Sequence, residues 1–419
     1  MVRKMKHTEI GDIPVDWELQ TFEETFRVLS NNTLSRDNLN NRGGAVRNIH
    51  YGDILTKFPE VLDCHEEDIP YINDLSLLTS STQLLQDGDI VVADTAEDET
   101  VGKITEVQNL GDSKLVAGLH TIPCRVKKGD FAPGWLGYYM NSDLFHNQIL
   151  PYITGIKVSS ISKGAISETL ILIPPFDEQE KIVQSLNEIQ LLMTAETKVV
   201  NKIKFVKNGC LSKMFPQKDD TVPGMRLPGF TDAWEQRKLG EIGSVSMCRR
   251  IFKEQTSENG EIPFYKIGTF GGEADAFISR ELFEEYKAKY QYPKKGDILI
   301  SASGSIGRTV VFTGKNEYFQ DSNIVWLNHD KHLDNSFLKC FYSIVKWAGI
   351  EGSTIKRLYN DNILNTAITL PSVEEQQKIG AYFENLDNLI TLHQRKCDKY
   401  SNIKKGMMSD LLKGKIRLV

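Results

Sequence analysis

The chain has 419 residues, and 40% of them are hydrophobic, which is enough to bury two ordinary cores. Its formal net charge is −6, so the protein is not basic throughout, although binding to nucleic acid requires only a basic patch. No apolar run approaches the roughly 18 residues that a membrane span needs, and the first residues lack the apolar segment of a signal peptide. We therefore expect a cytoplasmic protein without a membrane segment.

The six cysteines are scattered along the chain. None forms a Cys-x-x-Cys pair, and no two histidines stand at metal-ligand spacing. We expect reduced thiols and no metal site.

Up to about residue 175, short strand-like runs alternate with turns. Each run carries β-branched residues bounded by Gly, Asp or Pro, and a more helical stretch follows late in the segment. The strand-like runs are 51–55, 87–93, 120–126 and 169–174, and the helical stretch is 134–150. This mixture predicts a first α+β domain over residues 1–175.

From Asp177 the apolar residues follow alternating three- and four-residue steps. A proline lies just upstream, acidic residues fill the first turn, and lysines crowd the end, as is typical of a helix. The pattern predicts a coiled-coil-like helix over 176–215, with about 35 residues in heptad phase, roughly 50 Å long.

A segment with three prolines and two glycines follows, and we interpret 216–233 as a linker. A second globular domain is expected over 234–371, with a solvated helix face at Glu281 to Lys289. A second long helix is expected over 372–419, because its apolar residues have the same spacing as those of the first.

The second half of the chain repeats landmarks of the first half in the same order. Pro-x-x-x-Glu-Gln occurs at 174–179 and at 371–376, and earlier pairs are Trp17 with Trp234 and Gly88 with Gly296. The offsets fall from 217 to 208 to 197, as in a collinear duplication with a shorter second copy. We predict an α+β protein of two globular domains and two long antiparallel coiled-coil helices, related by a pseudo-twofold internal repeat.

The motifs of catalysis are missing or out of context. Pro174-Pro175-Phe176 is like the Pro-Pro-aromatic loop of amino-methyltransferases, but it lacks the preceding Asn or Asp. Glu285-Tyr286-Lys287 has a nuclease-like spacing without the paired Pro-Asp strand. No nucleotide-binding Gly-rich loop or nucleophile elbow is present. We therefore expect no catalytic residue and no cofactor in this chain.

Loop 301–308 offers hydroxyls, backbone N–H groups and an arginine after a strand, which suits a DNA contact. A tight turn between strands is an equally good interpretation. The basic, hydroxylated segments 155–160 and 352–359 are the next candidates. The candidate DNA-binding residues are Arg47, His50, Tyr51, Lys103, Lys157, Ser159, Arg249, Arg250, Lys266, Ser303, Ser305, Arg308, Lys356, Arg357 and Tyr359.

The chain resembles the DNA-specificity (S) subunits of type I restriction-modification systems over nearly its whole length. The resemblance lies in residues 7–17, 47–54 and 227–240 and, most of all, in the duplicated Pro-x-x-x-Glu-Gln helix starts. It implies that each globular part is a target recognition domain that reads one half of a split, asymmetric DNA sequence. It also implies that the long helices set the spacing between half-sites.

The resemblance further implies two methyltransferase (modification) subunits and motor-nuclease (restriction) subunits as partners. S-adenosylmethionine, ATP and Mg²⁺ would belong to those partners. Two alternatives remain from the residues alone: a methyltransferase or nuclease with its own activity, and a coiled-coil assembly scaffold without a role on DNA.

Overall fold

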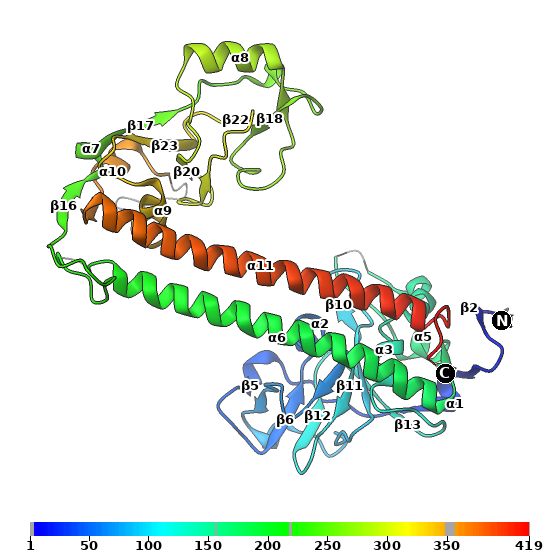
Figure 1. The fold of residues 1–419 in the computed structure, drawn as a ribbon. Coiled ribbons are helices and arrows are strands. Elements are labelled where there is room, and N and C mark those ends of the chain that lie inside the picture. The colour runs from blue at the N-terminus through cyan, green and yellow to red at the C-terminus, as the bar shows by residue number, and fades with distance from the viewer. Residues whose placement is uncertain (1–3, 156, 218–219, 348–356, 419) are drawn as a thin grey trace. The chain divides into compact units, whose positions relative to one another are not determined.

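The computed structural model describes residues 4–155, 157–217, 220–347 and 357–418. The chain forms two compact units (Figure 1). The first unit contains Met1–Ala195 together with Lys396–Val419, and the second unit contains Glu196–Arg395. Each unit therefore contains a globular domain and parts of both long helices.

The first unit contains two main sheets and a closing strand pair. The larger sheet has the order β4 (Phe26–Val28), β13 (Thr121–Val126), β9 (Ile90–Ala93), β11 (Ile104–Gln108) and β7 (Val61–Asp63). The second sheet has the order β12 (Lys114–Ala117), β6 (Val46–Ile49), β8 (Tyr71–Ile72) and β5 (Leu39–Asn40). The pair β3 (Glu18–Thr21) and β15 (Leu170–Ile173) joins the start of the domain to its end.

Short helices and smaller strand pairs complete this domain. The helices are α1 (Phe22–Thr25), α2 (Tyr51–Thr56), α3 (Trp135–Tyr139), α4 (Asp143–Ile149) and α5 (Lys163–Ser167). The remaining strands are the hairpin β1 (Met5–Thr8) and β2 (Gly11–Pro14), and the pair β10 (Thr95–Ala96) and β14 (Ser159–Ser160). One core cluster contains Trp17 and Trp135, whose rings meet edge to face with centroids 6.5 Å apart.

The second unit is built in the same way. Its larger sheet has the order β17 (Gly243–Met247), β23 (Ile324–His329), β20 (Ile298–Ser301) and β21 (Thr309–Val311). Its smaller sheet has the order β19 (Phe277–Ile278), β18 (Ile262–Tyr265) and β22 (Tyr318–Phe319), and β16 (Glu235–Lys238) pairs with β24 (Ala367–Leu370). Its helices are α7 (Leu239–Ile242), α8 (Arg280–Lys289), α9 (Asn335–Ile344) and α10 (Asn360–Leu364).

The two sheets of the second unit reproduce the strand order of the first. The run β17-β23-β20-β21 matches β4-β13-β9-β11, and in both units the central pairs are antiparallel. In the smaller sheets β18 pairs in parallel with β22, as β6 does with β12. The main addition in the first unit is the parallel edge strand β7 on β11. The duplication predicted from sequence landmarks is therefore a duplication of topology.

The long helices are α6 (Phe176–Met214) and α11 (Val373–Leu411), each of 39 residues. In the first unit Lys404, near the end of α11, donates to Gln190 Oε1, in the first half of α6, at 2.8 Å. In the second unit Lys207, late in α6, pairs with Asp387, early in α11. The helices are therefore antiparallel within each unit, and the predicted fold class is confirmed.

Most of the expected strands and helices are present, but one prediction is wrong. The runs 87–93, 120–126 and 169–174 contain β9, β13 and β15, and 134–150 contains α3 and α4. Residues 51–55, predicted as a strand, form helix α2 instead. His50 caps this helix by accepting from the Gly52 N–H at 3.2 Å, and such a cap favours a helix over an extended chain.

Among the described residues, no helix is both long and apolar enough to cross a membrane.

Candidate nucleic-acid interface

Loop 302–308 of the second unit connects β20 to β21 and is a tight, internally bonded turn. Ser301 N donates to Arg308 O at 2.9 Å, and Gly307 N donates to Ser301 O at 3.0 Å. Gly304 and Gly307 have φ of 64° and 83°, where side chains with a Cβ are strained. The sequence left open whether this loop is a turn or a contact surface. It is a turn in form, and its tip exposes Ser305 and Arg308.

The segment after residue 356 lies against this loop. Ser303 and Arg357 form an isolated antiparallel bridge, and Leu358 N donates to Ala302 O at 2.8 Å. The guanidinium of Arg357 donates to Ser322 O at 3.0 Å and lies 6.0 Å from the centre of the Tyr359 ring. Tyr359 is 62% exposed, so its ring offers a free face for stacking.

The guanidinium of Arg308 is held through one of its nitrogen atoms. Its Nη1 donates to Phe270 O at 2.7 Å, and the side chain is otherwise exposed. Such a side chain keeps donors for a phosphate or a guanine edge, because a guanidinium carries five N–H groups. Asn323 supports the same surface by accepting from Ser303 Oγ at 2.8 Å.

A cavity of about 730 Å³ adjoins the loop, and its lining includes Asn323. Two predicted residues, Arg250 and Lys266, also line it. Arg250 pairs with Asp321 at 2.6 Å, and Lys266 pairs with Asp275 at 2.9 Å. Both cations are more than 40% exposed, so water screens these pairs and a phosphate could compete for either cation.

Arg249 lies beside this cavity rather than in it. Its guanidinium sits 5.3 Å from the centre of the Tyr290 ring, a cation–π contact. The structure thus brings together seven predicted residues of the second unit around the loop and cavity: Arg250, Lys266, Ser303, Ser305, Arg308, Arg357 and Tyr359. Lys356 lies outside the described residues.

In the first unit the pair β10–β14 has the position of the Ser303–Arg357 bridge. Thr95 pairs with Ser160 and Ala96 with Ser159, directly after β9. The predicted residue Ser159 is therefore half-buried in a strand, and Lys157 is exposed in the turn before it. Both sites use the same design, a short bridge between the loop after the central strand and the segment before the last short helix.

An aromatic group lies next to β10. The rings of His50 and Tyr51 have centroids 4.7 Å apart, and Tyr51 meets His120 edge to face at 5.3 Å. His120 Nδ1 lies 3.3 Å from Thr95 Oγ1 and 3.4 Å from Asp94 Oδ1. Burial and the Arg36 cation lower the pKa of His50, although Asp53 opposes this effect.

Two predicted residues of the first unit point inward instead. Arg47 is 8% exposed in β6 and donates to Cys64 O at 2.6 Å. Lys103 donates to Leu55 O at 3.2 Å, and burial lowers its pKa. Because both side chains point to internal carbonyls, we remove them from the candidate interface.

Sequence reasoning missed Asn323, His120 and Thr95. His120 has φ of 55°, a left-handed conformation that is uncommon outside glycine, and nothing in the local pattern indicates it. The neighbours of Asn323 are distant in sequence, so only the fold reveals its role.

Within the described ranges, no group of three or more His, Cys, Asp or Glu side chains is placed to hold a metal ion. The exposed groups of the candidate interface are single cations, hydroxyls and rings. The arrangement suits binding rather than bond-making chemistry.

The family model of the "type I restriction modification DNA specificity domain" matches residues 231–399. A putative type I restriction enzyme specificity subunit of Haemophilus influenzae is 45% identical over 252 residues, which are 59% of this chain and 64% of that relative. A putative specificity subunit of Methanocaldococcus jannaschii is 25% identical over 99% of this chain and 96% of its own length.

Solved structures show the same fold. The S subunit of a type I restriction-modification system from M. genitalium has a TM-score of 0.57 and 14% identity, over 98% of this chain and 99% of that one. A chain from a study of assembly and conformational transition of a type I system has a TM-score of 0.55 and 16% identity, over 96% and 99%. The chain is thus similar in sequence and in fold to DNA-specificity (S) subunits of type I restriction-modification systems, the family that its sequence resembles.

Proposed function

We propose that this chain is the non-catalytic specificity subunit of a type I restriction-modification complex. It recognises an asymmetric, bipartite DNA sequence and directs methyltransferase and restriction subunits to it. We keep residues 1–175 and 234–371 as target recognition domains, 176–215 and 372–419 as spacer helices, and 216–233 as the linker.

This proposal rests on one observation: the two units share a backbone arrangement but differ in the side chains that this arrangement presents. Both units place a short bridge after the central strand, at Thr95–Ser160 and at Ser303–Arg357. In the first unit this position carries His120 and Tyr51, whereas in the second unit it carries Arg308 and Tyr359. The same backbone arrangement with different side chains suits two half-sites of different sequence, because base edges are read by side-chain donors and acceptors.

The long helices support assembly with partners. In the first unit Leu191 is 68% exposed, and in the second unit Phe205 is 80% exposed. Further exposed apolar residues of these helices are Leu192, Val206, Leu389, Leu392 and Ile403. A stable protein rarely exposes so many large apolar side chains on two helices unless another chain covers them.

The proposed chemistry belongs to the partners. S-adenosylmethionine would serve two methyltransferase subunits, and ATP and Mg²⁺ would serve the restriction subunits. A flipped adenine would be held by a methyltransferase subunit, since extrusion from the stack is how such enzymes reach a base. This chain would supply the register on the duplex. A complex that modifies and cuts cellular DNA would act in the cytoplasm.

The test is to map methylated adenines made by the chain together with its methyltransferase subunits. A variant with Arg308→Ala and Tyr359→Ala should relax one half-site and leave the other unchanged, at about 1–3 kcal/mol per lost base contact. Arg237→Ala is the control, because the Arg237 side chain is 41% exposed and pairs with Glu235 in its own strand. Methylation of one continuous site, or relaxation of both halves by the double variant, would refute the proposal.

A further inference from the structure

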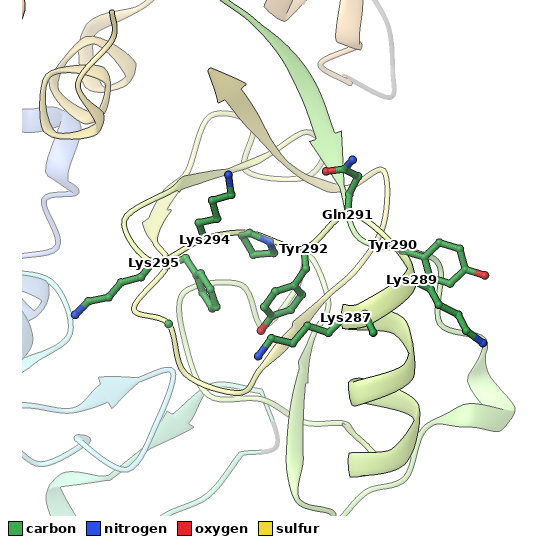
Figure 2. Close-up of a pocket in the computed structure, with 11 residues that line it drawn as sticks. Lys287, Lys289, Tyr290, Gln291, Tyr292, Lys294 and Lys295 are labelled. Atoms are coloured by element: carbon green, nitrogen blue, oxygen red, sulfur yellow. The ribbon is translucent and has the colours of Figure 1, made fainter. Parts of the chain in front are cut away.

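A second basic surface of the second unit lies around the end of α8 and the chain that follows it. Residues 287–295 read Lys-Ala-Lys-Tyr-Gln-Tyr-Pro-Lys-Lys, so two lysines lie on each side of two tyrosines. These residues, with Phe312 and Gly314, line an open cavity of about 800 Å³ (Figure 2). The four lysines are exposed.

Three of these lysines have no carboxylate partner among the residues that the structure describes. Lys289 pairs with Glu285 at 2.9 Å, but Lys287, Lys294 and Lys295 form no such pair. The ammonium of Lys287 lies 5.0 Å from the centre of the Phe283 ring and 5.2 Å from that of Tyr292. Figure 2 shows this side chain running beside Tyr292. The rings position the charge without neutralising it, so it stays available to an anion.

The backbone that presents Lys294 and Lys295 is fixed. Lys294 N donates to Asp297 Oδ2 at 2.7 Å, and Gly296 N donates to Phe312 O at 2.8 Å. Pro293 is buried. Holding the backbone rigid lowers the entropic cost of placing two adjacent ammonium groups against a ligand.

The first unit has the same backbone arrangement without the charge. Gln86 N donates to Asp89 Oδ2 at 2.9 Å, and Gly88 N donates to Val107 O at 2.8 Å, which matches Lys294 and Gly296. Gln86 and Asp87 thus stand where the second unit has Lys294 and Lys295. Residues 79–87 contain no lysine or arginine at all. The lysines are not needed to build this turn.

We propose that Lys287, Lys294 and Lys295 form a contact for the DNA phosphate backbone that the second unit has and the first unit lacks. The inference rests on the proposed function and deepens it: the second unit grips the duplex outside the bases that it reads. Lysine binds phosphate as a point charge and carries no sequence information, so this contact adds affinity and not specificity.

The experiment measures binding of the full chain to duplex DNA containing its target, between about 50 and 200 mM salt. The test variant is Lys287→Thr, Lys294→Gln and Lys295→Gln. The slope of log affinity against log salt should become shallower by about 2 to 3, since each phosphate contact contributes about 0.9. Preference for the target over an altered half-site should not change.

The control variant removes the same charge elsewhere, with Lys181→Gln, Lys331→Gln and Lys405→Gln, all exposed positions. Its slope should change by less than about 1. Because Lys287 packs over two rings, Lys294→Gln with Lys295→Gln is a milder second variant that keeps this packing, and its slope should fall by about 1 to 2.

An unchanged slope in both test variants, with normal target preference, would overturn the phosphate contact and leave the proposed function standing. An equal fall in the control would overturn it too, since net charge alone would explain the result. Should the unaltered chain show no preference for any duplex sequence, alone or with its methyltransferase subunits, the proposed function itself fails. A loss of partner assembly in the test variant, with no effect on DNA, would assign these lysines to a protein contact instead.

Discussion

Gln179 and Gln376 make the same three hydrogen bonds, each in the first turn of a long helix. Both amides are buried, at 0% and 1% exposure. Each accepts one backbone N–H and donates to two carbonyls, so a single side chain ties the helix start to the neighbouring loop. In the first unit the partners are Ala132, Asp130 and Pro174, and in the second they are Asp334, His332 and Pro371.

Replacing Gln376 by Ala should lower the free energy of unfolding by about 2–4 kcal/mol, because a buried N–H and two carbonyls lose their partner. Chemical denaturation of the full chain measures this change. Gln184→Ala, at an exposed position of α6, should stay within about 0.5 kcal/mol. A small effect at both positions would show that the amide does not hold the junction.

Arg417 should stabilise the first unit strongly. It donates to both oxygens of Glu178, at 2.6 and 2.7 Å, and the Glu178 residue is only 1% exposed. Among the described residues, Arg417→Ala leaves this buried carboxylate with the Trp17 N–H as its remaining side-chain partner, so the free energy of unfolding should fall by about 3–5 kcal/mol. Arg417→Lys, which keeps the charge but loses the fork, should be intermediate.

Arg226 is bound to Glu375 in the same bidentate way, with both contacts at 2.7 Å, so Arg226→Ala should have an equal effect on the second unit. Thermal unfolding monitored by hydrogen exchange would show which unit has lost stability in each variant. Loss in the wrong unit, or none, would contradict the prediction.

His50 should make the first unit sensitive to mild acid. Because its pKa in the folded state is lowered from 6.5, the unfolded chain takes up the proton first. The contribution of His50 to the free energy of unfolding is therefore fully present above pH 6.5. This contribution is lost as the pH falls below 6.5 towards the lower pKa of the folded state. Protonation also removes the ring nitrogen that accepts from Gly52.

The variant His50→Asn keeps a helix cap but cannot titrate. The difference in unfolding free energy between about pH 7.5 and pH 5.5 should thus be smaller in this variant than in the unaltered protein. Equal pH dependence of the two proteins would show that His50 does not contribute.

Phe205 should matter for assembly and not for folding. Its ring is 80% exposed on α6, so Phe205→Ser should change the unfolding free energy by less than about 0.5 kcal/mol. Binding to the methyltransferase subunits, measured by analytical ultracentrifugation, should weaken by about tenfold or more, since buried aromatic anchors dominate interfaces. Lys202→Ser, exposed on the same helix, is the matched control.

The long helices were predictable because their signals are local. Heptad spacing, an upstream proline and acidic first turns all act within a few residues. The helix at 176–214 matches the expected range of 176–215, whereas the helix at 373–411 begins as expected but ends eight residues before the expected 419. Helix α2 was not predictable in this way. The Asp53 carboxylate of this helix is held by the Arg36 guanidinium at 2.7 and 2.9 Å, and α2 depends on this pair from another segment as well as on its cap.

The types of residue in the candidate interface could be predicted from the sequence, but the exposure of each side chain could not. Lys103 and Arg308 follow equivalent glycines, and each donates to a backbone carbonyl, but Lys103 is half-buried against the end of α2 whereas Arg308 is exposed. Arg47 was misjudged because all four residues of β6 are buried, which a run of Val-Arg-Asn-Ile does not indicate. Lys294 and Lys295 were missed because the difference in charge between the two units becomes visible only when these lysines are aligned with Gln86 and Asp87 in the equivalent turn of the first unit.

The closing strand pairs give each domain a natural boundary for exchange. The chain enters and leaves the first domain where Glu18 pairs with Ile173, and the second where Glu235 pairs with Leu370. A crossover at these strand pairs would exchange a whole globular domain. Gln179, Gln376 and the two long helices would stay unchanged. Under the proposed function, exchange of an intact domain would change the DNA sequence preference and leave the two long helices unaltered.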